Sequence, residues 1–369
     1  MKAAAAIRWL VFAFTAAIGL SACHQNGTVF AVDITTDSVD ANPGDGLCAD
    51  ASGSCSVRAA VMEANAVPGV EEIRLMAGTT HFLTIDGGYE DAAATGDLDI
   101  TDAVVVTGDG AIDATAILDR VFDIRHSSGL VELEDLDLRG TAMTPGSIQA
   151  GSVLLHEGSG SLLVSRSDIS GTAHPLGSAV HLGGGPAIVS ATTIQAVAID
   201  GPIPTSLTIS SPMVVSLWNV TVRGVPTQNP PDLAVVVYGI PPGSTQPSKV
   251  TVHHSSILGA WVGDATISGS IVEECLTSLI YTYALPISAG RNVETGTTCG
   301  FDEPDDQQNA DPLLGPLADN GGSAPTALPA AGSPAIDTGP CTVAVDARML
   351  PRPSGVSCDS GAVEVQPTP

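Results

Sequence analysis

A short alternation of apolar and polar positions recurs along the middle of the chain. Each copy has two apolar residues two apart, two spacer residues, and two more small or apolar residues two apart, often followed by glycine. Alternation with period two places the apolar side chains of each half on one strand face, and the spacer turns the chain through a corner. The copies are Val131–Gly140, Leu162–Gly171, Val215–Gly224 and Val250–Gly259, with weaker ones at Ala187–Ala196 and Leu98–Thr107.

The spacing of these copies separates two all-β architectures. Successive copies end 33, 31, 25, 28 and 35 residues apart, whereas the strands of a β-sandwich recur roughly every 8 to 12 residues. A period of this size suits one coil of a solenoid with loops of variable length. The pattern therefore predicts an all-β fold, a right-handed parallel β-helix, with a sandwich as the alternative.

The segment after Cys55 has a different period. Val57, Ala60, Val61 and Ala64 fall at helical spacing on one stripe, and Ser56 precedes them at the position of a helix N-cap. An open first coil of a solenoid could pair with another chain unless something covers it. We predict a short amphipathic helix that caps the N-terminal end.

The first residues resemble a bacterial lipoprotein signal. A basic start is followed by the mostly apolar run Trp9–Leu20, too short to span a bilayer comfortably, and the run ends in Leu20-Ser21-Ala22-Cys23. The resemblance to a lipobox implies removal of residues 1–22 and a lipid on Cys23, so that the membrane is a partner through this anchor. His24, which is not Asp, implies the outer membrane where a host has two. The expected location is the cell envelope, on the periplasmic or surface side.

Composition narrows the partners. The formal net charge is -27, and 44% of the residues are hydrophobic. An acidic field of this size opposes nucleic acid, and the apolar content excludes a disordered chain. Polysaccharide or a surface protein remain as expected partners, and the oligomeric state stays open.

The cysteines indicate disulfides. Apart from Cys23 the chain has six, an even number in an exported protein, without the clustered spacing of a zinc site. Six cysteines allow fifteen connectivities, and the three pairs of neighbours along the chain are the economical choice. These pairs are Cys48 with Cys55, Cys275 with Cys299, and Cys341 with Cys358.

Both ends of the mature chain carry more specific motifs. The run Cys-Ser-Val-Arg-Ala-Ala-Val from Cys55, the opening Thr28–Val32 and the segment Gly96–Thr101 resemble the CSLREAI-domain family. Ala310–Gly322 and Cys358–Glu364 resemble the choice-of-anchor Q region. The resemblance implies an exported bacterial protein with a β-helical, pectin-lyase-like body and no general reaction.

One residue departs from the family signature. Ala59 stands where the family has glutamate, so no role for that carboxylate carries over. The domain organisation we expect is a signal peptide (1–22), a tether (23–27), a CSLREAI-like cap (28–95), β-helix coils (96–300) and a choice-of-anchor Q-like closing region (301–369).

Acidic residues near the start of the coils are the main candidates for chemistry. Asp97, Asp99 and Asp102, with Asp109 and Asp113 beyond, could gather as oxygen ligands for calcium or could form a solvated polar face. A second acidic loop lacks the residue order of a calcium loop; it carries Asp37, Asp40, Asp45 and Asp50.

Three other motifs favour structural roles. Asp337-Thr338-Gly339 matches one half of an aspartic protease dyad but has no second copy and lies in the closing region. The pair His253-His254 falls at a coil corner, where adjacent side chains diverge. Arg139 and Arg223 share a register position with two coils between them, so local pairing with acids such as Asp137 is expected.

The enzymatic alternatives have few residues to work with. A β-helical polysaccharide lyase needs a basic residue and positive charge or calcium, and Lys249 is the one lysine of the mature chain. A glycosidase needs paired carboxylates, for which Asp97 and Asp99 are the candidates. The sequence thus favours a non-catalytic envelope lipoprotein, a scaffold for adhesion or glycan binding, with no catalytic residue or cofactor assigned beyond calcium as an option. A lyase or glycosidase acting on an acidic or neutral polysaccharide is the alternative.

Overall fold

The computed structural model describes most of the chain beyond its N-terminus. The described residues are 27–88, 90–141, 151–173, 177–198, 204–210, 214–225, 232–238, 249–276 and 284–367. The predicted signal peptide, Cys23 and all of the tether except its last residue lie outside them. No helix within these ranges is long and apolar enough to cross a membrane.

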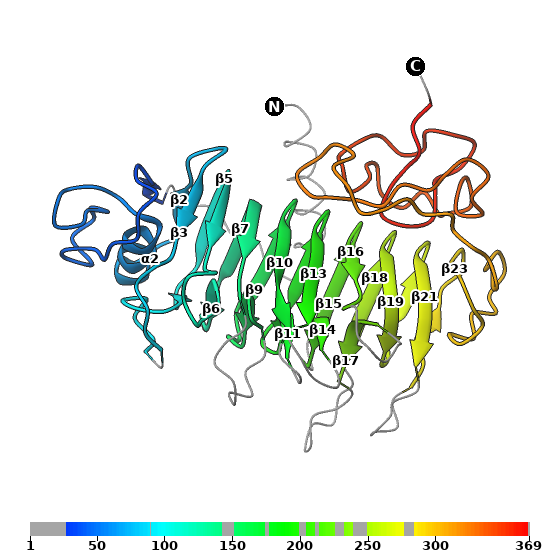
Figure 1. The fold of residues 1–369 in the computed structure, drawn as a ribbon, viewed down its shortest axis with the longest axis horizontal. Helices are drawn as coiled ribbons and strands as arrows, with labels where there is room; N and C mark the ends of the chain where they lie inside the picture. The colour runs from blue at the N-terminus through cyan, green and yellow to red at the C-terminus, as the bar shows by residue number, and fades with distance from the viewer. Residues whose placement is uncertain are drawn as a thin grey trace.

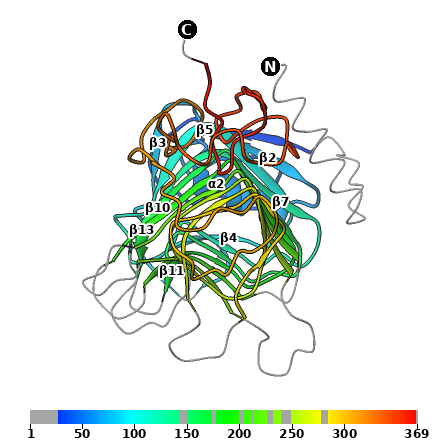
Figure 2. The ribbon, with the colours of Figure 1, turned by 90° about the vertical axis from the view of Figure 1, so that its right-hand side faces the viewer.

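The fold is the predicted right-handed parallel β-helix. The strands of the described residues join into one 23-stranded sheet that winds around a long axis, with neighbouring coils paired in parallel (Figures 1 and 2). Three columns of strands form three faces around one continuous apolar core. The first face contains β1 (Val29–Ala31), β2 (Glu71–Arg74), the first halves of β5 (Val104–Asp113) and β7 (Leu130–Arg139), β9 (Ser161–Ser165), β12 (Ala187–Ser190), β15 (Val214–Trp218), β18 (Lys249–His253), β20 (Thr266–Ser268) and β22 (Ile287–Ser288).

The other two faces complete each coil. The second face contains β3 (Thr80–Phe82), the second halves of β5 and β7, β10 (Asp168–Ala173), β13 (Thr193–Ala198), β16 (Thr221–Arg223), the first halves of β19 (Ser256–Val262) and β21 (Ile271–Leu276), and β23 (Val293–Glu294). The third face contains β4 (Leu98–Ile100), β6 (Phe122–Ile124), β8 (Leu154–His156), β11 (Ser178–Leu182), β14 (Thr205–Ile209), β17 (Leu233–Val237) and the second halves of β19 and β21.

The sequence repeat corresponds to the corner between the first and second faces. The first apolar residues of five copies stack in one column, and all are at most 2% exposed: Val131, Leu162, Ala187, Val215 and Val250. The second spacer residue of each of these copies has a left-handed backbone; these are Asp135, Arg166, Ala191, Asn219 and His254, with φ between 47° and 56°. The spacer therefore turns the chain as predicted.

The register predicted for the weak copy Leu98–Thr107 is wrong. Leu98 lies in β4 on the third face, where it pairs with Phe122. In this coil, the strand that continues the first face is β5, because Val106 pairs with Leu133 of the next copy. A register shift between Thr107 and Gly110 lengthens the spacer of β5, so this coil does not match the spacing of the other copies.

The predicted capping helix is α2 (Val57–Ala66), at the N-terminal end of the stack (Figure 1). The Ala59 amide donates to the Ser56 hydroxyl at 3.0 Å, which satisfies one of the free N–H groups of the first turn. The predicted apolar stripe faces the core, because its four residues are at most 3% exposed. All three predicted disulfides are present, Cys48–Cys55, Cys275–Cys299 and Cys341–Cys358.

The closing region does more than end the last coil. Gln307 bridges to Val293 and so extends that coil. The chain then turns back along the side of the solenoid (Figure 1), where Asn219 Nδ2 donates to the Val345 carbonyl at 3.0 Å and His254 Nε2 lies 2.8 Å from Thr342 Oγ1. The closing region therefore also covers the corner formed by the spacer residues.

Candidate functional site

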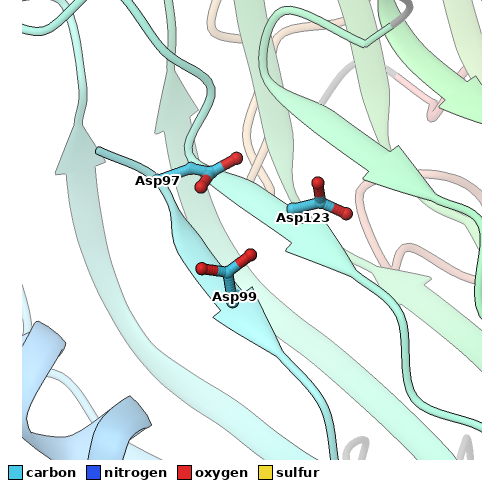
Figure 3. A group of neighbouring side chains, drawn as sticks. All are labelled: Asp97, Asp99 and Asp123. Atoms are coloured by element: carbon cyan, nitrogen blue, oxygen red, sulfur yellow. The ribbon is translucent and has the colours of Figure 1, made fainter. Parts of the chain in front are cut away.

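Three carboxylates meet on the third face near the N-terminal end. Asp97 directly precedes β4, Asp99 lies in β4, and Asp123 is its register partner in β6. One oxygen of each lies within 4.8 Å of the others, and Figure 3 shows an Asp99 oxygen pointing toward the gap between Asp97 and Asp123. Alternation explains the placement, because Leu98 and Ile100 point into the core and leave the aspartates on the outer side.

The three carboxylates are nevertheless buried. Asp97 is 6%, Asp99 1% and Asp123 3% exposed, so the alternative of a solvated polar face is wrong for Asp97 and Asp99. The loop before β4 contributes to the cover: the Ala93 amide donates to Asp99 Oδ2 at 2.9 Å. Asp91 of the same loop pairs at 3.1 Å with Arg125, which follows β6.

Two guanidinium groups only partly balance the charge. Arg120 lies 3.3 Å from Asp97, 3.1 Å from Asp123 and 3.8 Å from Asp119. Arg125 contacts Asp123 at 2.8 Å. We call Asp97, Asp99, Asp119 and Asp123 the acidic cluster; its four carboxylates and these two guanidiniums sum to -4 + 2 = -2 when all are ionised.

Burial, together with this excess of negative charge, raises the pKa values of three aspartates of the acidic cluster. Burial, reinforced by the charge of Asp119, raises the pKa of Asp97 to about 8. Burial is also the largest cause that raises the pKa of Asp99 to about 7, and it raises the pKa of Asp119. Asp99 Oδ1 is buried and has no hydrogen-bond partner among the described residues. The acidic cluster is therefore short of positive charge and of donors.

These features fit a hard divalent cation. The donor set consists of carboxylate oxygens alone, which calcium prefers, and a divalent ion would offset the excess negative charge of the ionised carboxylates. Asp97, Asp99 and Asp123 would supply part of the roughly six to eight oxygen ligands that calcium takes. A bound cation would also satisfy Asp99 Oδ1, which is buried without a hydrogen-bond partner among the described residues.

The other aspartates proposed for calcium do not join the acidic cluster. Asp102 accepts from the Ala103 amide, Asp113 accepts from Thr115, and Asp109 occupies a left-handed corner position with φ 54°. In the acidic loop, each aspartate is engaged locally. Asp37 pairs with Arg58, Asp40 accepts from the Asn42 and Ala49 amides, Asp45 from the Leu47 amide, and Asp50 from the Ser52 and Ser54 amides.

Structural contacts are found for the histidine pair, for Asp337 and for Arg139. His254 is buried at the corner against Thr342, while His253 stacks on Trp218 with ring centroids 4.1 Å apart. Asp337 accepts from the Ser357 amide within the closing region. Arg139 pairs with Asp137, as expected.

The sequence identified two residues of the acidic cluster and missed the rest. The predictions made from the sequence do not point to Asp119 and Asp123, or to Arg120, which pairs with them. A usable signal exists, since Leu-Asp-Ile at 98–100 and Phe-Asp-Ile at 122–124 repeat one coil apart. Such a repeat places like residues on adjacent coils, within about 5 Å of each other.

Comparisons with known proteins identify the fold but no family. No family model and no curated protein matches the chain. Among solved structures, the crystal structure of pectate lyase Pel9A matches with a TM-score of 0.50 and 12% sequence identity, over 92% of this chain and 97% of that one. At this identity the likeness shows a shared parallel β-helix fold.

Proposed function

We propose that this protein is a cation-dependent polysaccharide lyase that acts on uronate polymers. The observation that carries the proposal is the buried acidic cluster, with its missing charge and its unpartnered Asp99 oxygen. The fold shared with a pectate lyase supports the substrate class. With a net charge of -27, the chain repels polyuronates unless a cation bridges the two.

The residues of the site have separate tasks in this proposal. Asp97, Asp99 and Asp123 hold the cation, which when bound neutralises a uronate carboxylate and so acidifies the neighbouring C–H. Arg120 is buried between the carboxylates and fixes their positions. The half-exposed guanidinium of Arg125, at the outer side, binds a carboxylate of the polymer.

A second candidate, the non-catalytic scaffold, is favoured by one observation. A lyase needs a base, and the hydrogen bonds that Arg125 donates to Asp123 raise the pKa of Arg125 further above its already high value. Arg125 thus stays protonated and serves to bind the polymer. If no other residue supplies the base, the same site binds uronate polymers without cleaving them.

The remaining proposals concern location and organisation. We propose a lipid anchor on Cys23 in the cell envelope and keep the CSLREAI-like and choice-of-anchor Q-like assignments and the domain boundaries given above. Cys23→Ser should release the folded protein from the membrane pellet into the soluble fraction. Retention in the pellet would contradict the anchor.

The activity test uses the full chain with the Cys23→Ser substitution. Polygalacturonate, alginate and a neutral glucan are incubated with calcium or with a chelator, and both unsaturated products and new reducing ends are measured. Unsaturated products that need calcium and disappear in Asp123→Asn support the lyase. Reducing ends without unsaturation indicate a glycosidase that uses the same carboxylates.

The same samples test the scaffold. Calcium-dependent binding of a uronate polymer without any product supports it and rejects the lyase. Absence of both binding and products rejects both candidates. Arg139→Ala, a change on the second face away from the acidic cluster, is the control and should behave as the parent protein does.

A further inference from the structure

The capping helix α2 directs two polar side chains at the acidic cluster. Arg58 and Asn65 are seven residues apart, two helical turns, and so lie on one side of α2. Arg58 Nη1 donates to the Asp97 carbonyl at 3.2 Å, and Asn65 Nδ2 donates to the Asp99 carbonyl at 2.7 Å. The helix therefore binds the backbone carbonyls of two residues whose side chains would hold the cation.

Arg58 also fastens the loop that covers the acidic cluster. Its guanidinium, fully buried, donates to the Ala93 carbonyl at 2.9 Å and to the Gly96 carbonyl at 2.8 Å. The Ala93 amide in turn donates to Asp99 Oδ2. Arg58 thus acts on Asp99 through the residue that orients its carboxylate.

An ion pair holds the start of the same loop. Asp37 binds Arg58 at 2.7 Å, with both side chains fully buried. The second oxygen of Asp37 accepts from the Thr84 amide at 2.7 Å and from the Ile85 amide at 2.9 Å. Both ends of the loop, at 84–85 and at 93–97, are therefore fixed to one buried ion pair.

Capping the first coil does not by itself require these contacts of Arg58 and Asn65. The apolar stripe of α2 already covers the first coil, and burying a guanidinium costs free energy that apolar residues would not. The remaining polar side chain of α2, the buried Glu63, faces elsewhere: it accepts from the Gly44 and Gly46 amides in the preceding loop. α2 thus has one polar anchor for its own loop and two for the acidic cluster.

We propose that α2 is a clamp for the cation site and that Arg58 and Asn65 are its positioning residues. The inference rests on the proposed cation site and extends it to residues that never touch the ion. Outer partners of this kind hold ligand oxygens in a fixed arrangement, and their loss typically weakens metal binding about 10- to 100-fold.

The test compares three variants of the full chain, Asn65→Ala, Arg58→Lys and Glu63→Gln. Calcium affinity is measured by calorimetry, terbium affinity by luminescence, and thermal stability by circular dichroism. Asn65→Ala and Arg58→Lys should raise the Kd for both ions about tenfold or more. Glu63→Gln, the matched control, should lower the melting temperature similarly and leave the Kd within twofold. Equal Kd values in all three variants and the parent would overturn the clamp while leaving the cation site in place.

A second readout separates the clamp from the cation site. If the parent protein binds neither ion, the proposed cation site fails. Hydrogen exchange of the Ala93 amide in the metal-free protein then decides about the clamp. Exchange faster in Asn65→Ala and Arg58→Lys than in the parent and in Glu63→Gln supports control of this loop by α2, and unchanged exchange rejects it. Should Arg58→Lys not fold, Asn65→Ala, at a half-buried position, still decides the outcome.

Discussion

Among the described residues, two buried clusters of charged side chains differ in how well their carboxylates are satisfied. In the closing region, Asp346, Arg348, Arg352, Asp359 and Glu364 form what we call the C-terminal charged cluster, and all are at most 9% exposed. The acidic cluster near the N-terminal end is equally buried. Burial alone therefore does not distinguish a structural group from a binding site.

Every carboxylate oxygen of the C-terminal charged cluster accepts a hydrogen bond. Asp346 accepts from Arg348, from the Leu350 amide and from the Glu364 amide. The oxygens of Asp359 and Glu364 accept from backbone amides as well. Its three carboxylates and two guanidiniums sum to -3 + 2 = -1.

The acidic cluster has a larger excess of negative charge, and one of its oxygens, Asp99 Oδ1, has no donor among the described residues. This difference predicts which of the two clusters should tolerate the loss of a carboxylate. Removing a satisfied charge leaves its partners unpaired, whereas removing an excess charge relieves repulsion. The predictions below test this contrast.

The largest effect is expected in the C-terminal charged cluster. Asp346→Asn removes the charge that pairs with Arg348 at 2.7 Å in a fully buried position. Breaking such a pair should lower the free energy of unfolding by about 3 kcal/mol. Urea unfolding followed by circular dichroism measures it, and a loss below about 1 kcal/mol would show that this cluster is not the structural one.

The next effect concerns cation binding at the acidic cluster. Calcium at about 100 times its Kd should stabilise the parent protein by about 2.7 kcal/mol. Asp99→Asn should lose most of this gain, because it removes a ligand and its charge. Without metal, Asp99→Asn should be at least as stable as the parent, unlike Asp346→Asn. The measurement is urea unfolding with calcium or a chelator, and equal calcium stabilisation of both proteins would contradict the site.

The pH dependence should be smaller and distinctive in sign. The folded-state pKa values of Asp97 and Asp99, about 8 and about 7, lie above the ordinary value of 3.8, so folding favours their protonated forms. That contribution is full below pH 3.8 and is lost as the pH rises through 7 and 8. The metal-free protein should lose on the order of 1 kcal/mol between pH 6.5 and 9, allowing for solvent screening.

The pH range of the measurement matters because buried histidines change the stability in the opposite direction. Burial lowers the pKa of His156 to about 4, so its contribution to stability is lost as the pH falls from 6.5 toward 4. Unfolding of Asp97→Asn over the same alkaline range is the control. A slope unchanged by this substitution would mean that the aspartate is ionised in the folded state.

The smallest effect is expected at an exposed pair. Arg139 and Asp137 are 44% and 33% exposed, and such pairs contribute about 0 to 1 kcal/mol. Arg139→Ala should therefore change the free energy of unfolding by less than about 0.5 kcal/mol in urea. This baseline shows that the first two effects come from burial; a loss comparable to that of Asp346→Asn would remove the contrast.

The sequence predicted the fold from features that repeat. Period-two alternation with a two-residue spacer located the corner columns, and helical spacing after Ser56 located α2. The prediction from alternation is wrong at Leu98–Thr107, where a longer spacer in β5 shifts the register. Local patterns predict strands well, while an inserted residue moves a side chain to another face.

The acidic cluster could be predicted only in part. Asp97 and Asp99 stand out in the sequence, but Asp123 comes one coil later and meets them only through the pairing of β4 with β6. The burial of all three depends on a loop whose position Arg58 and Asp37 determine. The pairing of β4 with β6 has a signal in the repeat of Leu-Asp-Ile and Phe-Asp-Ile one coil apart. The contacts of Arg58 and Asp37 with the loop have none, because they join residues that are far apart in the chain.

By itself, the sequence determined the β-helix, its capping helix and the three disulfides, because apolar period, helix capping and neighbouring cysteines act over short distances along the chain. The tertiary structure alone decided that some aspartates are buried together with too few cations while others merely stabilise turns. The reason is that desolvation and charge balance depend on what lies within a few ångströms in space, and stacking of coils sets those neighbours.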